Sequence, residues 1–288
     1  MGERLKYWLY LALFMPLAWL PLPVLYLLSD LLRPIFQHVI HYRRKVIRRN
    51  LQSCYPEKSE AELREIENEF YRQFADNIVE TVKLLHISDR TMRSRLEVVG
   101  AHLVEEAADA DRPVILYLGH YCNWAWEPAL TLYFNRPRST SQIYKPLHDR
   151  AFDRLMLRVR SRFGAESIDM AHAVRRLLRL RQTDGTFITG FIADSRTSWR
   201  ATNQSTMFLR HKTMFYPGGE EIGSRMNARF LYLDVSKLGR GRYRFEFKEI
   251  QPQPDAPDYP YTRSYLSMLQ ATIDRQPAYW LWSHKRWV

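Results

Sequence analysis

Short strand-like runs alternate with stretches of helical periodicity along this 288-residue chain, and this alternation restricts its possible folds more than any other feature. The predicted strands are residues 113–119, 139–144, 186–192, 229–235 and 242–250. The first of them is a short apolar run that ends in glycine, which is typical of a strand buried on both faces. The helical stretches between the first four are residues 124–132, 151–162, 172–181 and 220–226. The pattern predicts an α/β fold with a central sheet flanked by helices.

Two local signals refine this prediction. Gly239-Arg240-Gly241 separates the last two runs and predicts a hairpin, so the sheet is expected to be mixed. Ser59 and Glu62 form a capping-box pattern, and apolar residues then recur every three or four positions from Leu63 to Leu85. The second signal predicts a long amphipathic helix whose apolar face packs on the core.

The N-terminal segment carries no charge over the 22 positions from Tyr7 to Leu28. At about 1.5 Å per residue, a straight helix of that length crosses a hydrocarbon core of roughly 30 Å. Basic residues are more numerous after the segment than before it, which predicts that residues 31–288 lie in the cytoplasm. Pro16, Pro21 and Pro23 favour a bent segment or one that lies in the interface. We therefore expect residues 1–30 to be a membrane-associated helical anchor ahead of one catalytic domain, residues 31–288.

The net charge of +12 is compatible with three partners: nucleic acid, an anionic membrane surface or an acidic protein. The chain has no nucleic-acid recognition motif, and its apolar N-terminus argues against that class. The two cysteines, Cys54 and Cys122, have neither metal-ligand spacing nor the pattern of a disulfide framework. A membrane or an acidic protein is therefore the expected partner.

His120 and Asp194 each follow the end of a predicted strand. Ligands of α/β sheets bind at the carboxyl ends of the strands, so both residues are placed to meet a ligand. A histidine there can act as a general base near neutral pH, and a nearby carboxylate can fix its tautomer and stabilise the imidazolium. Such a histidine is more often structural, so these residues alone do not decide between the two roles.

Residues 119–127, Gly-His-Tyr-Cys-Asn-Trp-Ala-Trp-Glu, resemble the histidine–x4–acid motif of the late acyltransferases of lipid A biosynthesis and their lysophospholipid acyltransferase relatives. The resemblance extends along nearly the whole chain. Further segments that resemble those of the family are residues 144–147 (Tyr-Lys-Pro-Leu), 153–160, 191–194 (Phe-Ile-Ala-Asp), 208–218 and the tryptophan-rich 277–287.

The resemblance implies transfer of a fatty acyl chain from an acyl–acyl carrier protein thioester to a hydroxyl of a lipid A precursor. It implies His120 as the base, a location at the bacterial inner membrane with the catalytic domain facing the cytoplasm, and no metal or redox cofactor. The acyl carrier protein, the lipid acceptor and the membrane are the expected partners. Candidate substrate contacts are Lys145, Arg158, Arg160 and Asn123, with the cations placed to bind phosphates on the acceptor or the donor.

One position departs from the family pattern. Ala125 occupies the place of the expected acid, five residues after His120. Either the substitution inactivates the chain, or Glu127 or Asp194 replaces the acid. The first interpretation is preferred, and it predicts that Ala125→Glu raises turnover. A lysophospholipid or aminolipid acceptor is an alternative to the lipid A precursor, and a catalytically silent membrane-binding homologue is another.

The C-terminal residues His284, Lys285 and Arg286 stand beside Trp280, Trp282 and Trp287. They are candidate contacts to lipid headgroups, because aromatic and basic side chains together favour a membrane interface. Packing of the terminal segment explains the tryptophans equally well.

Overall fold

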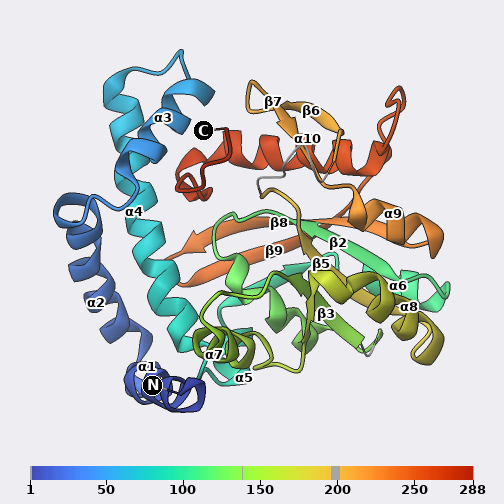
Figure 1. Cartoon of the computed structure of the whole chain (residues 1–288), viewed down its shortest axis with the longest axis horizontal. Coiled ribbons are helices and arrows are strands. Elements are labelled where there is room, and N and C mark those ends of the chain that lie inside the picture. The colour runs from blue at the N-terminus through green and yellow to red at the C-terminus, as the bar shows by residue number, and fades with distance from the viewer. Residues whose placement is uncertain (1, 138, 196–201, 288) are drawn as a thin grey trace.

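A central sheet covered by helices forms the body of the protein in the computed structural model, which describes residues 2–137, 139–195 and 202–287 (Figure 1). Within these ranges the sheet has seven strands in the order β1-β9-β8-β2-β5-β3-β4. They are β1 (Leu96–Val99), β2 (Val114–Leu118), β3 (Ser139–Tyr144), β4 (Glu166–Asp169), β5 (Phe187–Ile192), β8 (Arg229–Gly239) and β9 (Arg242–Glu249). Only β8 and β9 pair antiparallel in this sheet, so the predicted mixed α/β architecture and its hairpin are confirmed. A small second sheet pairs β6 (Ser205–Phe208) with β7 (His211–Met214).

Most of the predicted helices form close to their predicted bounds. The α-helices are α1 (Glu3–Trp19), α2 (Leu22–Pro34), α3 (Arg44–Cys54), α4 (Glu60–Lys83), α5 (Asp89–Arg93), α6 (His102–Asp109), α7 (Arg150–Arg160), α8 (Ala173–Thr183), α9 (Gly218–Arg225) and α10 (Pro260–Arg275). Ser59 caps α4, and Glu62 completes the capping box as predicted. The predicted helix at residues 124–132 is instead a 3₁₀-helix, η2 (Trp124–Tyr133), which contains Pro128. Shorter turns of helix are η1 (Ile35–Val39), η3 (Met170–His172) and η4 (Pro277–Tyr279).

The N-terminal apolar segment is a bent pair of helices rather than one straight helix. α1 ends at Trp19 and α2 begins at Leu22, because Pro21 cannot continue the hydrogen bonding of α1. The Lys83 ammonium of α4 donates to the carbonyls of Ala18 and Leu20 at the break, at 2.8 Å each. In the described ranges no single helix is long and apolar enough to cross a membrane, but the two arms, bent by 117°, meet that test together.

The two arms pack against the rest of the chain on one side only. α1 packs on α7 and α4, and α2 packs on α4 (Figure 1). The other side of the pair exposes large apolar side chains; Leu13, Leu27 and Leu31 are 61%, 70% and 63% exposed. α2 also continues through residue 30, the expected end of the anchor, without interruption. An uncovered apolar surface of this kind commonly marks a site of interaction with a membrane or another molecule.

Close packing against α10 fixes the carboxyl end of β2. The Tyr265 hydroxyl donates to the carbonyl of Leu118, the last residue of the strand, at 2.8 Å. A Cβ at Gly119 would lie 2.6 Å from Cδ1 of the buried Leu269, so any other residue there would force the Leu269 side chain to shift. The residue that follows, His120, therefore leaves the sheet from a rigid position.

Candidate active site

The register of the sheet brings His120 and Asp194 together. β2 and β5 are parallel neighbours, and Leu118 is paired with Ile192. His120 and Asp194 therefore both lie two residues beyond the same pair of positions. Adjacent strands are about 4.8 Å apart, so side chains at these two positions can contact each other directly.

The two side chains do make contact. Nδ1 of His120 lies 2.6 Å from Oδ1 of Asp194. An ionised carboxylate can only accept hydrogen bonds, so Nδ1 must carry the proton and donate it. The other ring nitrogen, Nε2, is then unprotonated in the neutral imidazole and can accept a proton from a ligand. The His120 side chain is 19% exposed, whereas that of Asp194 is buried, so the base is accessible and its partner is not.

Three donors surround the Asp194 carboxylate. Besides Nδ1 of His120, its other oxygen accepts from the backbone N–H of His120 at 2.9 Å and from Nε1 of Trp280 at 2.8 Å. Burial alone would raise the pKa of Asp194, but the charge and hydrogen bond of His120, the nearby Arg286 cation and the Trp280 donor hold this pKa well below its usual range. Asp194 is therefore ionised at neutral pH.

The turn after His120 is held from α4. Cys122 has a φ of 53°, in the left-handed region that non-glycine residues rarely adopt. Asn77 donates to the carbonyl of Cys122 at 2.7 Å, and Asn123 donates to the buried carboxyl of Glu80. The predicted substrate contact Asn123 is thus fully buried and engaged with α4. Strained turns of this kind are maintained where the surroundings over-determine them, which is common at functional sites.

Ala125 and Glu127 lie in the 3₁₀-helix rather than on one face of an α-helix with His120. Ala125 is half-buried, and Glu127 is buried with its carboxyl against Gly190, where a Cβ would be 2.6 Å from Oε1. Gly190 lies four residues before Asp194, about 13 Å along an extended strand. In the described part of the chain Glu127 has no hydrogen-bond partner, and burial raises its pKa to about 8. Of the three positions considered for the acid, Asp194 alone contacts His120.

The predicted cationic contacts differ in their surroundings. Arg160, at the end of α7, is largely buried and lies over the Tyr144 ring with its guanidinium 5.2 Å from the ring centroid. Its Nη1 is buried and has no hydrogen-bond partner in the residues the structure describes. Tyr144 ends β3, the strand next to β5, so this cation lies at the same sheet edge as Asp194. Lys145 is exposed, and exposed Arg158 donates to the Tyr7 hydroxyl of α1 at 3.4 Å.

The C-terminal segment contributes to the site in a way that the sequence did not predict. The backbone N–H of Leu281 donates to the carbonyl of His120, and that of Cys122 donates to the carbonyl of Tyr279. The His284 ring lies against the His120 ring, with centroids 5.3 Å apart. Arg286 is buried behind Trp280 rather than exposed to headgroups. The sequence of the C-terminal segment contains no pattern that would have predicted its contacts with the His120 turn.

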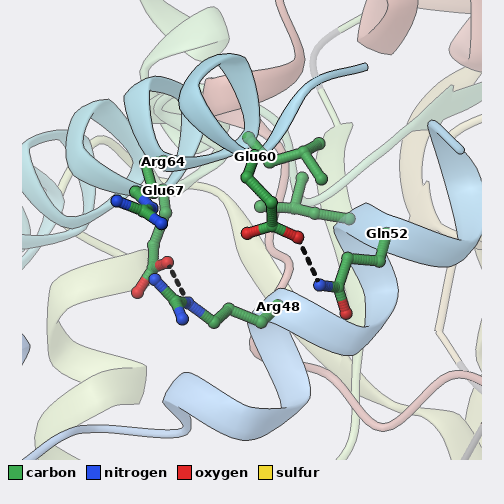
Figure 2. A pocket seen from close by; sticks show the side chains of 7 residues that line it. Arg48, Gln52, Glu60, Arg64 and Glu67 are labelled. Carbon is green, nitrogen blue, oxygen red and sulfur yellow. Dashed lines mark hydrogen bonds and ion pairs between the residues drawn. The ribbon is translucent and has the colours of Figure 1, made fainter. Parts of the chain in front are cut away.

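Two shallow pockets lie near α4. One lies between α3 and α4, and polar groups that line it are engaged with one another (Figure 2). Arg48 donates to Glu67 at 2.8 Å, and Gln52 donates to Glu60 at 2.9 Å. It contains none of the predicted site residues. The second pocket is lined mainly by aromatic and apolar side chains, including Trp124 and Trp280. Trp124 contacts His120, so this pocket borders the candidate site.

Comparisons with known proteins agree with the resemblance. Over 114 residues the chain is 27% identical to the lipid A biosynthesis lauroyltransferase of Escherichia coli (strain K12), a match that covers 40% of this chain and 37% of that relative. Residues 2–288 match the sequence model of the family described as bacterial lipid A biosynthesis acyltransferase. The chain therefore belongs to the bacterial lipid A biosynthesis acyltransferase family.

Proposed function

We propose that this protein transfers a fatty acyl chain from an acyl–acyl carrier protein thioester to a hydroxyl of a lipid A precursor. The single observation that carries the proposal is the His120–Asp194 pair at the carboxyl edge of the sheet, in a chain of this family. Membership of the family supports a lipid A precursor as the acceptor. The resemblance of the sequence motifs to those of the late acyltransferases supports an acyl carrier protein as the donor. Nothing in this chemistry calls for a metal or a redox cofactor.

His120 acts as the general base in the proposed reaction. Nε2 accepts the proton of the acceptor hydroxyl as its oxygen attacks the thioester carbonyl, forming a C–O bond and a tetrahedral oxyanion. The C–S bond then breaks, and the leaving thiolate takes the proton from the imidazolium. Asp194 holds the reactive tautomer and stabilises the positive charge that His120 carries between these steps.

Asp194 replaces the missing acid at position 125 in this proposal. It has the contact, the ionisation state and the burial that the role needs. Ala125 is then no reason to regard the chain as catalytically silent. Arg160 is the proposed phosphate contact, because it is a cation with an unpartnered buried Nη1 at the same sheet edge.

The bent pair α1–α2 is the proposed membrane contact. Its exposed leucines and tryptophans face away from the body of the protein, and an interfacial helix buries such a face among lipid headgroups. In this proposal the pair holds the protein at the cytoplasmic face of the inner membrane, where the lipid A precursor would be its substrate.

A transfer assay tests the proposed reaction. The full chain is incubated with labelled acyl–acyl carrier protein and vesicles that hold a lipid A precursor, and the products are identified by mass spectrometry. We expect acylated precursor, and a loss of about 10²–10⁴-fold in kcat for His120→Ala. His102→Ala, at an exposed position on α6, is the matched control. Acylation of a lysophospholipid or aminolipid alone would reject the acceptor, and no transfer to any lipid would favour a silent homologue.

Vesicle sedimentation tests the membrane contact in the intact chain. Leu27→Glu and Leu31→Glu each place a charge on the exposed face of α2, and we expect both to reduce the bound fraction. Leu178→Glu changes an exposed leucine on α8 and serves as the control. Unchanged binding of both α2 variants would reject this surface as the contact.

A further inference from the structure

His284 stands beside the reacting histidine with its own ring unengaged. The two ring centroids are 5.3 Å apart and the ring planes are tilted by 56°. Neither ring nitrogen of His284 has a hydrogen-bond partner in residues 2–137, 139–195 or 202–287. A half-buried imidazole with two unpartnered nitrogens next to a general base is available to a ligand rather than to the fold.

The backbone of His284 is held by hydrogen bonds on both sides of the peptide. Its carbonyl accepts from Nδ2 of the buried Asn50 at 2.9 Å, and its N–H donates to the carbonyl of Leu281. Leu281 itself donates to the carbonyl of His120. The two histidines are therefore joined through one short stretch of hydrogen-bonded backbone, which keeps their separation constant.

Two backbone amides of the His120 turn already have partners. The N–H of His120 donates to Asp194, and the N–H of Cys122 donates to the carbonyl of Tyr279. Neither can also stabilise the oxyanion of a tetrahedral intermediate without losing its present partner. A side-chain donor next to His120 could stabilise that oxygen instead, and the His284 imidazole is adjacent to the His120 ring.

Distances allow both rings to act on one carbon. Each ring nitrogen reaches a hydrogen-bond partner about 3 Å away. Two rings with centroids 5.3 Å apart can thus contact neighbouring oxygens of one reacting centre, the attacking oxygen at His120 and the carbonyl oxygen at His284. Resting on the acyl transfer proposed above, we infer that His284 is a second catalytic residue that donates a hydrogen bond to the developing oxyanion.

The electrostatic surroundings favour the neutral form that such a donor needs. Burial lowers the pKa of His284, and His120, Arg286 and Arg43 lower it further through their positive charge, in the case of His120 when it is protonated, while Asp194 acts in the opposite direction. A neutral imidazole has one N–H to donate. Neutral histidine serves as an electrophile of this kind in triosephosphate isomerase.

Paired substitutions test this role in the transfer assay. Removing one oxyanion donor typically lowers kcat by about 10²–10³-fold, so we expect that loss for His284→Ala with little change in KM. His284→Gln keeps a neutral N–H donor and is expected to recover about tenfold of the lost rate, the value of one hydrogen bond. His102→Ala and His102→Gln make the same changes on exposed α6 and should match the wild type.

The outcomes separate this inference from the proposal on which it rests. If the wild type transfers acyl chains and folded His284→Ala is as fast, the inference alone is overturned. If both His284 variants lose the same activity and the same thermal stability, His284 is structural and the inference is again overturned. If the wild type transfers nothing, the proposed function fails, and the inference fails with it.

Discussion

Asp194 and Glu127 are two buried carboxyls beside the same strand, β5, yet their environments give them opposite states. Asp194 accepts hydrogen bonds from two groups of His120 and one of Trp280, and its pKa is lowered. Glu127 lies against Gly190 with no hydrogen-bond donor in the described residues, and its pKa is raised to about 8. Burial is common to both, so the donors and the neighbouring positive charge make the difference.

The two carboxyls also show that proximity in the sequence does not decide which acid contacts His120. Glu127 is seven residues from His120 and Asp194 is 74 residues away, yet only the distant one is in contact. A carboxyl that is neutral at pH 7 cannot stabilise an imidazolium, whereas an ionised one can. Replacing each carboxyl in turn by the corresponding amide should therefore change kcat to very unequal extents.

The largest expected effect is that of Asp194→Asn. The amide can turn its N–H₂ toward Nδ1 and so favour the wrong tautomer of His120, a change that costs about 10⁴-fold in kcat in a serine-protease triad. We expect a loss of similar order in the transfer assay. Glu127→Gln, which replaces a neutral carboxyl by a neutral amide of the same shape, should keep most of the activity. Equal losses in the two variants would remove the distinction between the carboxyls.

The pH dependence of stability should differ in sign between the two carboxyls. The pKa of Glu127 rises from its usual 4.5 to about 8 on folding, so its contribution to stability is fully present below pH 4.5 and is lost as the pH rises through 8. The slope is at most about 1.4 kcal/mol per pH unit. Urea unfolding between pH 5 and pH 8 should therefore show a smaller decline for Glu127→Gln than for the wild type.

Asp194 should act at the acidic end of the same experiment. Its pKa is lowered below the usual 3.8, so its contribution is present above pH 3.8 and is lost as the pH falls further. Asp194→Asn should reduce the acid-induced loss of stability without changing the decline toward pH 8. A decline toward pH 8 that is identical in the wild type and Glu127→Gln would mean that Glu127 is ionised in the folded protein.

The smallest expected effect is that of Ala125→Glu. The sequence alone predicted a large gain in turnover, but Asp194 already occupies the Nδ1 side of His120. Since one ring nitrogen can donate to one orienting acid, we expect kcat to change by less than about threefold, within the range of a single weak hydrogen bond. A gain of about 10²-fold or more, in line with general-base magnitudes, would restore position 125 as the site of the missing acid.

Local patterns were enough to predict the main elements of the fold. The apolar runs ending near residues 119 and 192 formed β2 and β5, the glycines at 239 and 241 bounded a hairpin, and Ser59 with Glu62 capped α4. Each of these depends on a few adjacent residues. Short strands such as β1 and β4 were missed, because four residues of mixed polarity carry little periodicity.

The candidate site could be predicted only in part. The strand-end positions of His120 and Asp194 were visible in the sequence, but their contact depends on the pairing of Leu118 with Ile192, which is a long-range property. His284 and Arg286 were expected at lipid headgroups, and nothing local indicated that the terminal segment folds back onto the His120 turn. The break at Pro21 was among the expected alternatives.

The equal two-residue offset of His120 and Asp194 from a paired position in the sheet has a consequence for tolerance to insertions. Loops elsewhere can lengthen without moving either side chain, because the distance between the two is set by neighbouring strands. One residue added between Leu118 and His120 would instead turn the histidine to the opposite face of the sheet edge. In such a scaffold, natural variation in length should spare these two connections and accumulate at the opposite end of the strands.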